Sequence, residues 1–316
     1  MRRIGIIFGT CLVALAVAAA PAKKASARRP AAAQTAAVAK PAGTAQSAHR
    51  RSPYVGAISA EAGTGKVLFE DNADAAAYPA SVSKLMTLLL VLEDVKAGRY
   101  QLGTRVTATE DVYKAEPSVV GIRPKESMTV DDLLVALMVK SANDAAVALG
   151  VHSAGSLDAF VARMNARAAE IGMTRTTYYH PNGLPPKKRN GSKGFNVSTC
   201  RDQLKLALLL TRMPEVFRYT SVKVGEVTDG RGETLKFVNH NNLMVKNKKK
   251  ILNPDGSEAV DGLKTGYIDA GGSSIVLTGK RKGKRAIVVV LGSSTADERD
   301  ENAGRLLSDA LGALAW

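Results

Sequence analysis

The sequence predicts an α+β fold with one antiparallel sheet built from both chain ends, flanked by helices and interrupted by an inserted helical region. Three observations predict it. Two strand-like runs, 54–60 and 66–70, begin the folded part as a hairpin. The middle of the chain carries long apolar runs with helical spacing. Three consecutive strand-like runs and a helix then close the chain, so strands from both ends can share one sheet.

The individual elements follow from local signals. A helix is expected over 81–96, and because it is apolar on nearly every side it should be buried; Pro79 helps to fix its start. Three more helices are expected at 130–139, 144–152 and 157–171. Three late strands are expected at 262–268, 273–279 and 285–291, with a charged turn over 280–284 between the last two. A closing helix is expected at 297–311. The segment 178–197 is rich in proline and glycine and is expected to be a loop.

The first 51 residues do not read as a folded domain. Residues 1–22 combine two arginines, an apolar run and small residues at its end, the pattern of a secretory signal peptide. The run is short and rich in alanine, which favours cleavage over retention as a membrane anchor. Residues 23–51 carry almost no large apolar side chains, so we expect a disordered basic linker. We therefore expect a catalytic domain over 52–316 in a protein exported to the periplasm or cell envelope.

The net charge of +15 gives no argument for a nucleic-acid partner. Nine of the 44 basic residues and none of the 29 acidic residues fall in the first 51 positions, which leaves +6 for the remainder. The basic linker could instead contact anionic envelope polymers or lipid head groups, and a merely solvated spacer is the alternative.

Cysteine and histidine usage indicates no metal site. Cys11 lies in the expected signal peptide, so Cys200 would stand alone in the mature chain, without a disulfide partner. The four histidines show no metal-ligand spacing. We expect neither a metal nor a cofactor.

Three short strings carry the predicted chemistry, the first being Ser81-Val82-Ser83-Lys84. Ser81 and Lys84 are three residues apart at the start of a buried helix, so their side chains share one face. Burial beside a second cation lowers a lysine pKa, and a neutral Lys84 can take the hydroxyl proton from Ser81. The helix start favours an alkoxide and a tetrahedral oxyanion. We predict Ser81 as nucleophile and Lys84 as its base.

The second string, Ser141-Ala142-Asn143, interrupts two predicted helices, where small polar side chains can point toward a substrate. Ser141 is expected to relay a proton toward the leaving amine. Asn143 is expected to hold a substrate amide or Lys84.

The third string, Lys264-Thr265-Gly266, lies on a predicted edge strand. A cation and a hydroxyl there suit a substrate carboxylate, and the glycine lets substrate approach the strand closely. The backbone N–H of Tyr267 is expected to be an oxyanion donor beside that of Ser81. Each string alone is weak, since S-x-x-K arises roughly once by chance in such a chain. Their conjunction in this order predicts a serine acyl-transferase with lysine as base.

With these residues in view, the chain resembles the serine D-alanyl-D-alanine carboxypeptidases, the low-molecular-mass penicillin-binding proteins. Residues 78–87 resemble their nucleophile segment, and 140–146 their second motif, with Ala142 where glycine is usual. Residues 260–267, followed by Ala270 and Gly271, resemble their third motif. Arg299 stands where the family places an arginine that helps to bind the terminal carboxylate. The likeness runs from about 53 to 311 and implies a β-lactamase/penicillin-binding-protein-like fold.

The resemblance implies acyl transfer on peptidoglycan stem peptides. Ser81 would attack the D-alanyl carbonyl, release the terminal D-alanine and leave an acyl-enzyme that water hydrolyses. Penicillins and other β-lactams would acylate the same serine.

Three alternatives remain at this point. A D,D-endopeptidase of the same family would cleave cross-links with the same residues. A class A-like β-lactamase needs a glutamate followed four residues later by asparagine, between the second and third strings. The only match, Glu298 with Asn302, comes after the third string. An inactive wall-binding module is disfavoured because every proposed catalytic residue is present. The cleaved peptide, the base for deacylation, the oligomeric state and the role of Cys200 stay open.

Overall fold

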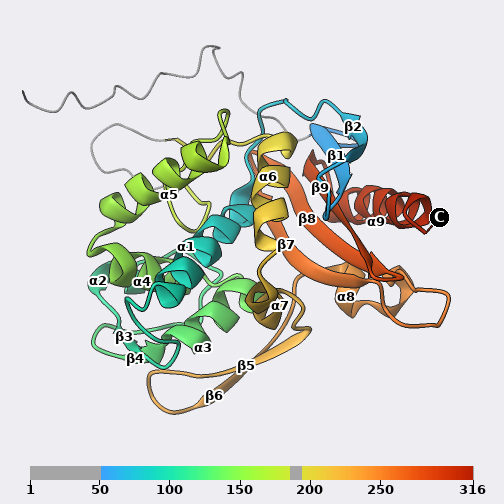
Figure 1. Cartoon of the computed structure of the whole chain (residues 1–316). Helices are drawn as coiled ribbons and strands as arrows, with labels where there is room; N and C mark the ends of the chain where they lie inside the picture. Colours follow the sequence, from blue (N-terminus) through green and yellow to red (C-terminus); the bar gives the residue numbers. More distant parts are fainter. Residues whose placement is uncertain (1–50, 186–193, 316) are drawn as a thin grey trace, which may run out of the picture. The chain divides into compact units, whose positions relative to one another are not determined.

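The computed structural model describes residues 51–185 and 194–315, and a five-stranded antiparallel sheet organises this part of the chain (Figure 1). Its strand order is β2-β1-β9-β8-β7. The strands are β1 (Gly56–Glu61), β2 (Val67–Asp71), β7 (Val260–Ile268), β8 (Gly272–Arg281) and β9 (Lys284–Ser293). The first strand pairs with the last, β1 with β9, so the prediction of one sheet built from both chain ends is confirmed. The predicted signal peptide, the linker up to residue 50 and 186–193 of the predicted loop lie outside the described residues.

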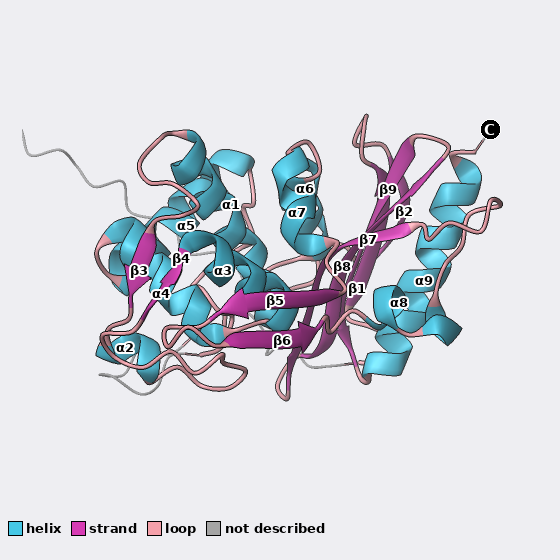
Figure 2. Cartoon of the chain, turned by 90° about the horizontal axis from the view of Figure 1, so that it is seen from below, coloured by secondary structure: helices cyan, strands magenta, loops and turns pink. Residues whose placement is uncertain are grey.

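The sheet is buried on both faces, because alternate side chains of a strand point to opposite sides. In β9, Ile287, Val289 and Leu291 pack into the core shared with the helical region. The alternate residues Val288 and Val290 pack into a second core against helix α9 (Ala296–Ala313). Figure 2 shows the sheet between α9 on one side and the remaining long helices on the other.

The helical region lies between β2 and β7 in sequence. Its longer helices are α1 (Lys84–Lys96), α3 (Val130–Val135), α4 (Asn143–Ala154), α5 (Leu157–Ile171), α6 (Cys200–Leu210) and α7 (Pro214–Thr220). Its short helices are α2 (Glu110–Tyr113) and α8 (Asn242–Val245). It also contains two two-stranded sheets, β3 (Arg105–Thr107) with β4 (Ser127–Thr129) and β5 (Val224–Thr228) with β6 (Thr234–Val238). Helix α1 is buried along nearly its whole length, as its apolar sequence predicts.

The structure refines two of the predicted helices. The one expected over 81–96 begins with a separate 3₁₀ turn, Ala80–Ser83, before α1. The one expected over 130–139 is α3 followed by a π-helical turn, Ala136–Lys140. Both irregular turns adjoin the catalytic strings predicted from the sequence. The sequence reasoning missed α6 and α7, although Thr199 caps the first and Pro214 begins the second.

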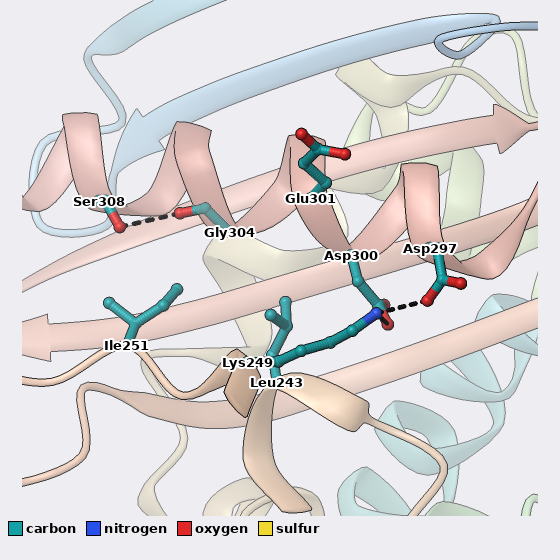
Figure 3. A pocket seen from close by; sticks show the side chains of 8 residues that line it. All are labelled: Leu243, Lys249, Ile251, Asp297, Asp300, Glu301, Gly304 and Ser308. Atoms are coloured by element: carbon teal, nitrogen blue, oxygen red, sulfur yellow. Dashed lines mark hydrogen bonds and ion pairs between the residues drawn. The ribbon is translucent and has the colours of Figure 1, made fainter. Parts of the chain in front are cut away.

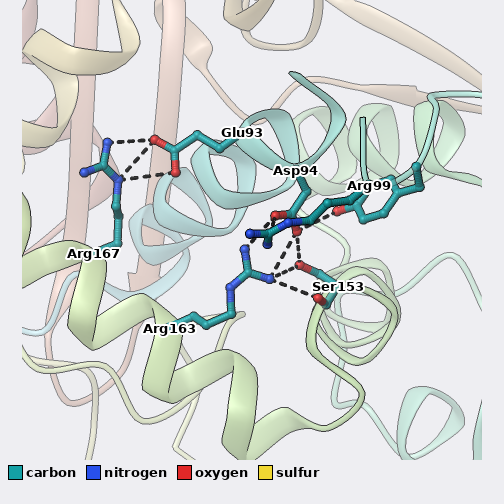
Figure 4. Close-up of polar contacts among 7 residues, drawn as sticks. Glu93, Asp94, Arg99, Ser153, Arg163 and Arg167 are labelled. Carbon is teal, nitrogen blue, oxygen red and sulfur yellow. Dashed lines mark hydrogen bonds and ion pairs between the residues drawn. The ribbon is translucent and has the colours of Figure 1, made fainter. Parts of the chain in front are cut away.

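An ionic cluster around the buried carboxylate of Asp94 ties the helices together (Figure 4). Asp94, near the end of α1, is 2% exposed and accepts a hydrogen bond from Ser153 of α4. It also forms an ion pair at 2.7 Å with Arg163 of α5. Beside it, Glu93 pairs with Arg167 at 2.7 Å. These contacts hold α1, which carries Lys84 at its other end, against α4 and α5.

No single helix within residues 51–185 and 194–315 is long and apolar enough to cross a membrane. Within these ranges, only the bent pair α4 and α5 has the combined length and composition.

Candidate active site

The serine of the first string sits in the 3₁₀ turn, and its lysine is the first residue of α1. Lys84 is fully buried, and its Nζ lies 2.9 Å from Oγ of Ser81. The same Nζ donates to Oδ1 of Asn143 at 2.7 Å and to the backbone carbonyl of Asn182 at 2.9 Å. A neutral amine has two N–H donors and one lone pair. The two oxygens of Asn143 and Asn182 match the donors, which leaves the lone pair for the proton of Ser81.

Electrostatics favour this neutral amine. Burial, followed by the charge of Lys264, holds the pKa of Lys84 well below its ordinary value. The carboxylate of Asp144 opposes these two causes. Desolvation and a like charge both disfavour an ammonium, so they favour the neutral amine that can accept the proton of Ser81.

Close backbone packing fixes the turn that carries Ser81. Ala80 has a left-handed backbone, φ 49°, which is uncommon for a residue with a side chain. A Cβ on Gly266 would lie 2.6 Å from the carbonyl oxygen of Pro79 and 3.1 Å from the nitrogen of Ser81. A Cβ on Gly183 would collide with the carbonyl of Ala80. Gly266 therefore lets strand β7 lie directly against the backbone of the turn that carries Ser81.

The second string lies where the π-helical turn meets α4. Ser141 is buried and left-handed, with φ 59°. Asn143 is held from both sides: its Nδ2 donates to the carbonyl of Glu116 and its backbone N–H to that of Ser118, each at 2.7 Å. Its Oδ1 is thereby aimed at Lys84. Among the described residues, the Ser141 hydroxyl has no hydrogen-bond partner, so its donor and acceptor remain available to a substrate.

Asp144 supports this arrangement and was not singled out from the sequence. Its carboxylate accepts backbone hydrogen bonds from Val120, Gly121 and Ile122. The loop beside Asn143 is therefore anchored to α4. The only sequence signal for Asp144 was its place directly after the second string. Asn182 was not singled out either, and its only signal was its place in the expected loop 178–197.

The third string lies on the edge strand β7, as predicted. Lys264 is 2% exposed and its Nζ donates to the carbonyl of Thr265 at 2.9 Å. Burial, followed by the charge of Arg299, lowers the pKa of Lys264 to about 7. Thr265 is buried, whereas the Tyr267 side chain is 55% exposed and donates to Asp269. The side chain of Tyr267 thus extends into solvent while its backbone stays in the sheet.

Lys264 and Arg299 form a cationic group beside the neutral amine of Lys84, and Arg299 itself is 4% exposed. His240 adjoins the same group: burial, and then the charge of Lys264, lowers its pKa to about 4. Burial also lowers the pKa of His180 to about 4. Both imidazoles are neutral at pH 7, although the sequence showed the histidines only as scattered. Buried cations of one sign suit an anionic ligand.

The site residues predicted from the sequence thus come together to different degrees. Ser81, Lys84 and Asn143 are in direct contact, and Gly266 packs on the turn of Ser81. Within the described residues, no hydrogen bond joins Ser141 to Lys84 or Lys264, and no group of three or more acidic, His or Cys side chains is placed to hold a metal ion.

An α+β fold in which a buried lysine contacts a serine three residues earlier is the arrangement of the penicillin-binding serine peptidases, and comparison with known proteins gives the family. The model of the peptidase S11 family, D-alanyl-D-alanine carboxypeptidase, matches residues 44–295. The chain belongs to this family.

Individual relatives agree with the family. The D-alanyl-D-alanine carboxypeptidase DacF of Bacillus subtilis is 30% identical over 254 residues, 80% of this chain and 61% of the relative. A D-alanyl-D-alanine endopeptidase of Escherichia coli is 28% identical over 236 residues, 74% of this chain and 70% of the relative. Penicillin-binding protein D2 of Listeria monocytogenes, solved in the ampicillin-bound form, is 32% identical with a TM-score of 0.67. That match covers 81% of this chain and 96% of the other. The chain thus spans about three fifths of the length of DacF.

Proposed function

We propose that the protein is a serine-type D-alanyl-D-alanine carboxypeptidase that removes the terminal D-alanine from peptidoglycan stem pentapeptides. The observation that carries the proposal is the fully buried Lys84 amine, 2.9 Å from the Ser81 hydroxyl and bonded to two further oxygens. The family match and the name of the DacF relative support the substrate class.

In the proposed acylation, neutral Lys84 accepts the Ser81 proton as Oγ attacks the carbonyl carbon of the penultimate D-alanine. The backbone N–H groups of Ser81 and Tyr267 stabilise the oxyanion. Ser141 relays this proton from Lys84 to the departing amine of the terminal D-alanine as its C–N bond breaks, which returns Lys84 to its neutral form. Water then hydrolyses the acyl ester and restores the Ser81 hydroxyl.

The substrate carboxylate is assigned to the cationic group. Lys264, Thr265 and Arg299 would bind it, because charge-assisted hydrogen bonds from buried donors are strong and directional. Asn143 would contact the substrate amide while holding Lys84. β-Lactams, which also carry a carboxylate, would acylate Ser81, and the ampicillin-bound Listeria relative supports this assignment.

We also propose a division of the whole chain into three parts. Residues 1–22 are assigned to an export signal, 23–51 to a basic spacer and 52–316 to the catalytic domain, acting outside the cytoplasmic membrane. The basic spacer is assigned a contact with anionic envelope polymers, for which its charge is the support.

The test incubates the purified chain with pentapeptide monomers and with cross-linked dimers, and identifies the products by mass. Release of D-alanine without opening of dimers supports the carboxypeptidase. Opening of dimers would instead select the second candidate, a D,D-endopeptidase, which the E. coli endopeptidase relative supports. Rapid turnover of penicillin would indicate a β-lactamase. Neither product, together with no labelling by fluorescent penicillin, would overturn the enzymatic assignment, and Ser81→Ala is the inactive control.

A further inference from the structure

The guanidinium of Arg299 has a buried acidic neighbour on the same helix. Nε and Nη2 of Arg299 both donate to Oδ1 of Asp300, at 2.9 Å and 2.5 Å. Asp300 is 1% exposed. An arginine has five N–H donors in a fixed plane. Because Nε and Nη2 of Arg299 bind one carboxylate, the edge that remains for another ligand is the one at Nη1.

The second oxygen of Asp300 is held in turn by two groups from α8 and the turn after it. Oδ2 accepts from Nδ2 of Asn242 at 2.9 Å and from Nζ of Lys249 at 3.1 Å. Lys249 also pairs with Asp297 at 2.6 Å. Figure 3 shows Lys249, Asp297 and Asp300 together on the wall of a cavity of about 460 Å³ beside α9. A carboxylate bonded on both oxygens cannot rotate freely.

We propose that Asp300 is a positioning residue that orients Arg299 toward the substrate carboxylate, and that Asn242 and Lys249 hold Asp300 in place. The inference rests on the proposed function, because it takes Arg299 as a ligand of that carboxylate. It deepens that function by adding a specificity determinant that touches no substrate atom.

Charge balance supports this role over simple packing. Arg299 is nearly fully buried, and a buried cation without a counter-charge is costly. Asp300 supplies that counter-charge at 2.5 Å, so Arg299 need not turn elsewhere for a partner. The Nη1 edge of Arg299 stays available because Asp300 uses Nε and Nη2.

The decisive variant is Asp300→Asn, which keeps the shape and removes the charge. An amide cannot accept from Arg299 on one side and from both Asn242 and Lys249 on the other, since one of its two polar atoms is a donor. With a peptide ending in D-Ala-D-Ala and a free carboxylate, we expect KM to rise about tenfold with kcat within about twofold. Active-site titration with fluorescent penicillin corrects for any loss of folded enzyme.

Two controls separate positioning from a structural effect. Asp297→Asn removes the exposed partner of Lys249 and is expected to leave KM within about twofold. In an Arg299→Gln background, Asp300→Asn should add nothing further to KM, because the residue through which it acts is gone.

Each outcome decides the inference. If wild-type protein releases no D-alanine, the proposed function fails. If wild-type protein is active but Asp300→Asn has an unchanged or lowered KM, or raises KM equally without Arg299, the positioning role is overturned. Should Asp300→Asn fail to fold, Asn242→Ala tests the same arrangement by removing a hydrogen bond to Oδ2 of Asp300. We expect KM to rise about threefold in this variant, and an unchanged KM would overturn the positioning role.

Discussion

Nζ of Lys84 and Oγ of Ser81 lie 2.9 Å apart at a position where the lysine has no exposed surface. Ser81 lies three residues before Lys84 in the sequence. The other two partners of the Lys84 amine, Asn143 and Asn182, lie 59 and 98 residues after it. The local spacing makes the pair possible, and the distant partners decide its orientation and charge.

Replacing the base should stop acylation without unfolding the protein. Lys84→Met keeps an unbranched apolar chain in a buried position but supplies no proton acceptor. We expect the rate of Ser81 acylation by fluorescent penicillin to fall about 10³-fold. Lys96→Met, at the other end of α1, is the matched control and should acylate normally. Normal acylation of the Lys84 variant would contradict its role as base.

The pH dependence should report the protonation of Lys84. Burial and Lys264 lower its pKa, so acylation should rise as pH increases through that lowered value and the amine becomes neutral. Asn143→Asp places a carboxylate 2.7 Å from Nζ and should raise the pKa of Lys84, moving the rising limb about one unit toward alkaline pH.

The control for this shift is Gln101→Glu, which adds the same charge at an exposed position after α1. Its pH–rate profile should match the wild type. A profile of Asn143→Asp that coincides with the wild type would show that another group controls the rate.

Gly266 should tolerate no side chain. In Gly266→Ala the new methyl would lie 2.6 Å from the carbonyl of Pro79, so β7 or the Ser81 turn must move. We expect a loss of about 1–3 kcal/mol in the free energy of unfolding and at least a tenfold slower acylation. Gly103→Ala, where an added Cβ meets nothing within 4 Å, should alter neither. Equal acylation by both variants would refute close packing at β7.

Asp94 should contribute to stability in a pH-dependent way. Burial by itself raises its pKa, but hydrogen bonds from Arg163 and Ser153 outweigh burial and lower the pKa below the ordinary value. Its contribution is therefore full above the unfolded-state pKa, about 4, and is lost as pH falls through the lower folded-state value.

The corresponding variant is Asp94→Asn, which leaves the guanidinium of Arg163 without its charged partner. We expect a loss of about 3 kcal/mol at pH 7, measured by urea unfolding, and a smaller difference from wild type at strongly acidic pH. Glu170→Gln removes a largely exposed partner of Arg167 and should cost less than about 1 kcal/mol. Equal losses of stability in both variants would contradict the larger contribution expected from the buried carboxylate of Asp94.

Much of the fold was predictable because its signals are local. The hairpin at the start, the apolar helix after Ser81 and the three late strands all appear at nearly the expected positions. The strong period-2 and period-3.6 patterns of these segments explain this success. The strands β3 and β4 were missed since three residues carry little periodicity. The hairpin β5–β6 was also missed, although both strands alternate between more and less exposed residues. Local patterns also did not predict the π-helical turn before Ser141.

The sequence by itself predicted which residues carry the chemistry, namely Ser81, Lys84 and two further strings, and it determined their order along the chain, which is that of one enzyme family. Only the tertiary structure decided that Asn143 and Asn182 converge on Lys84, that Gly266 packs on the Ser81 turn, and that Asp300 holds Arg299. The physical reason is the range of the interactions. Helix periodicity joins residues three or four apart, whereas pKa values, charge compensation and close backbone contacts depend on segments that meet only after the two ends of the chain have formed one sheet.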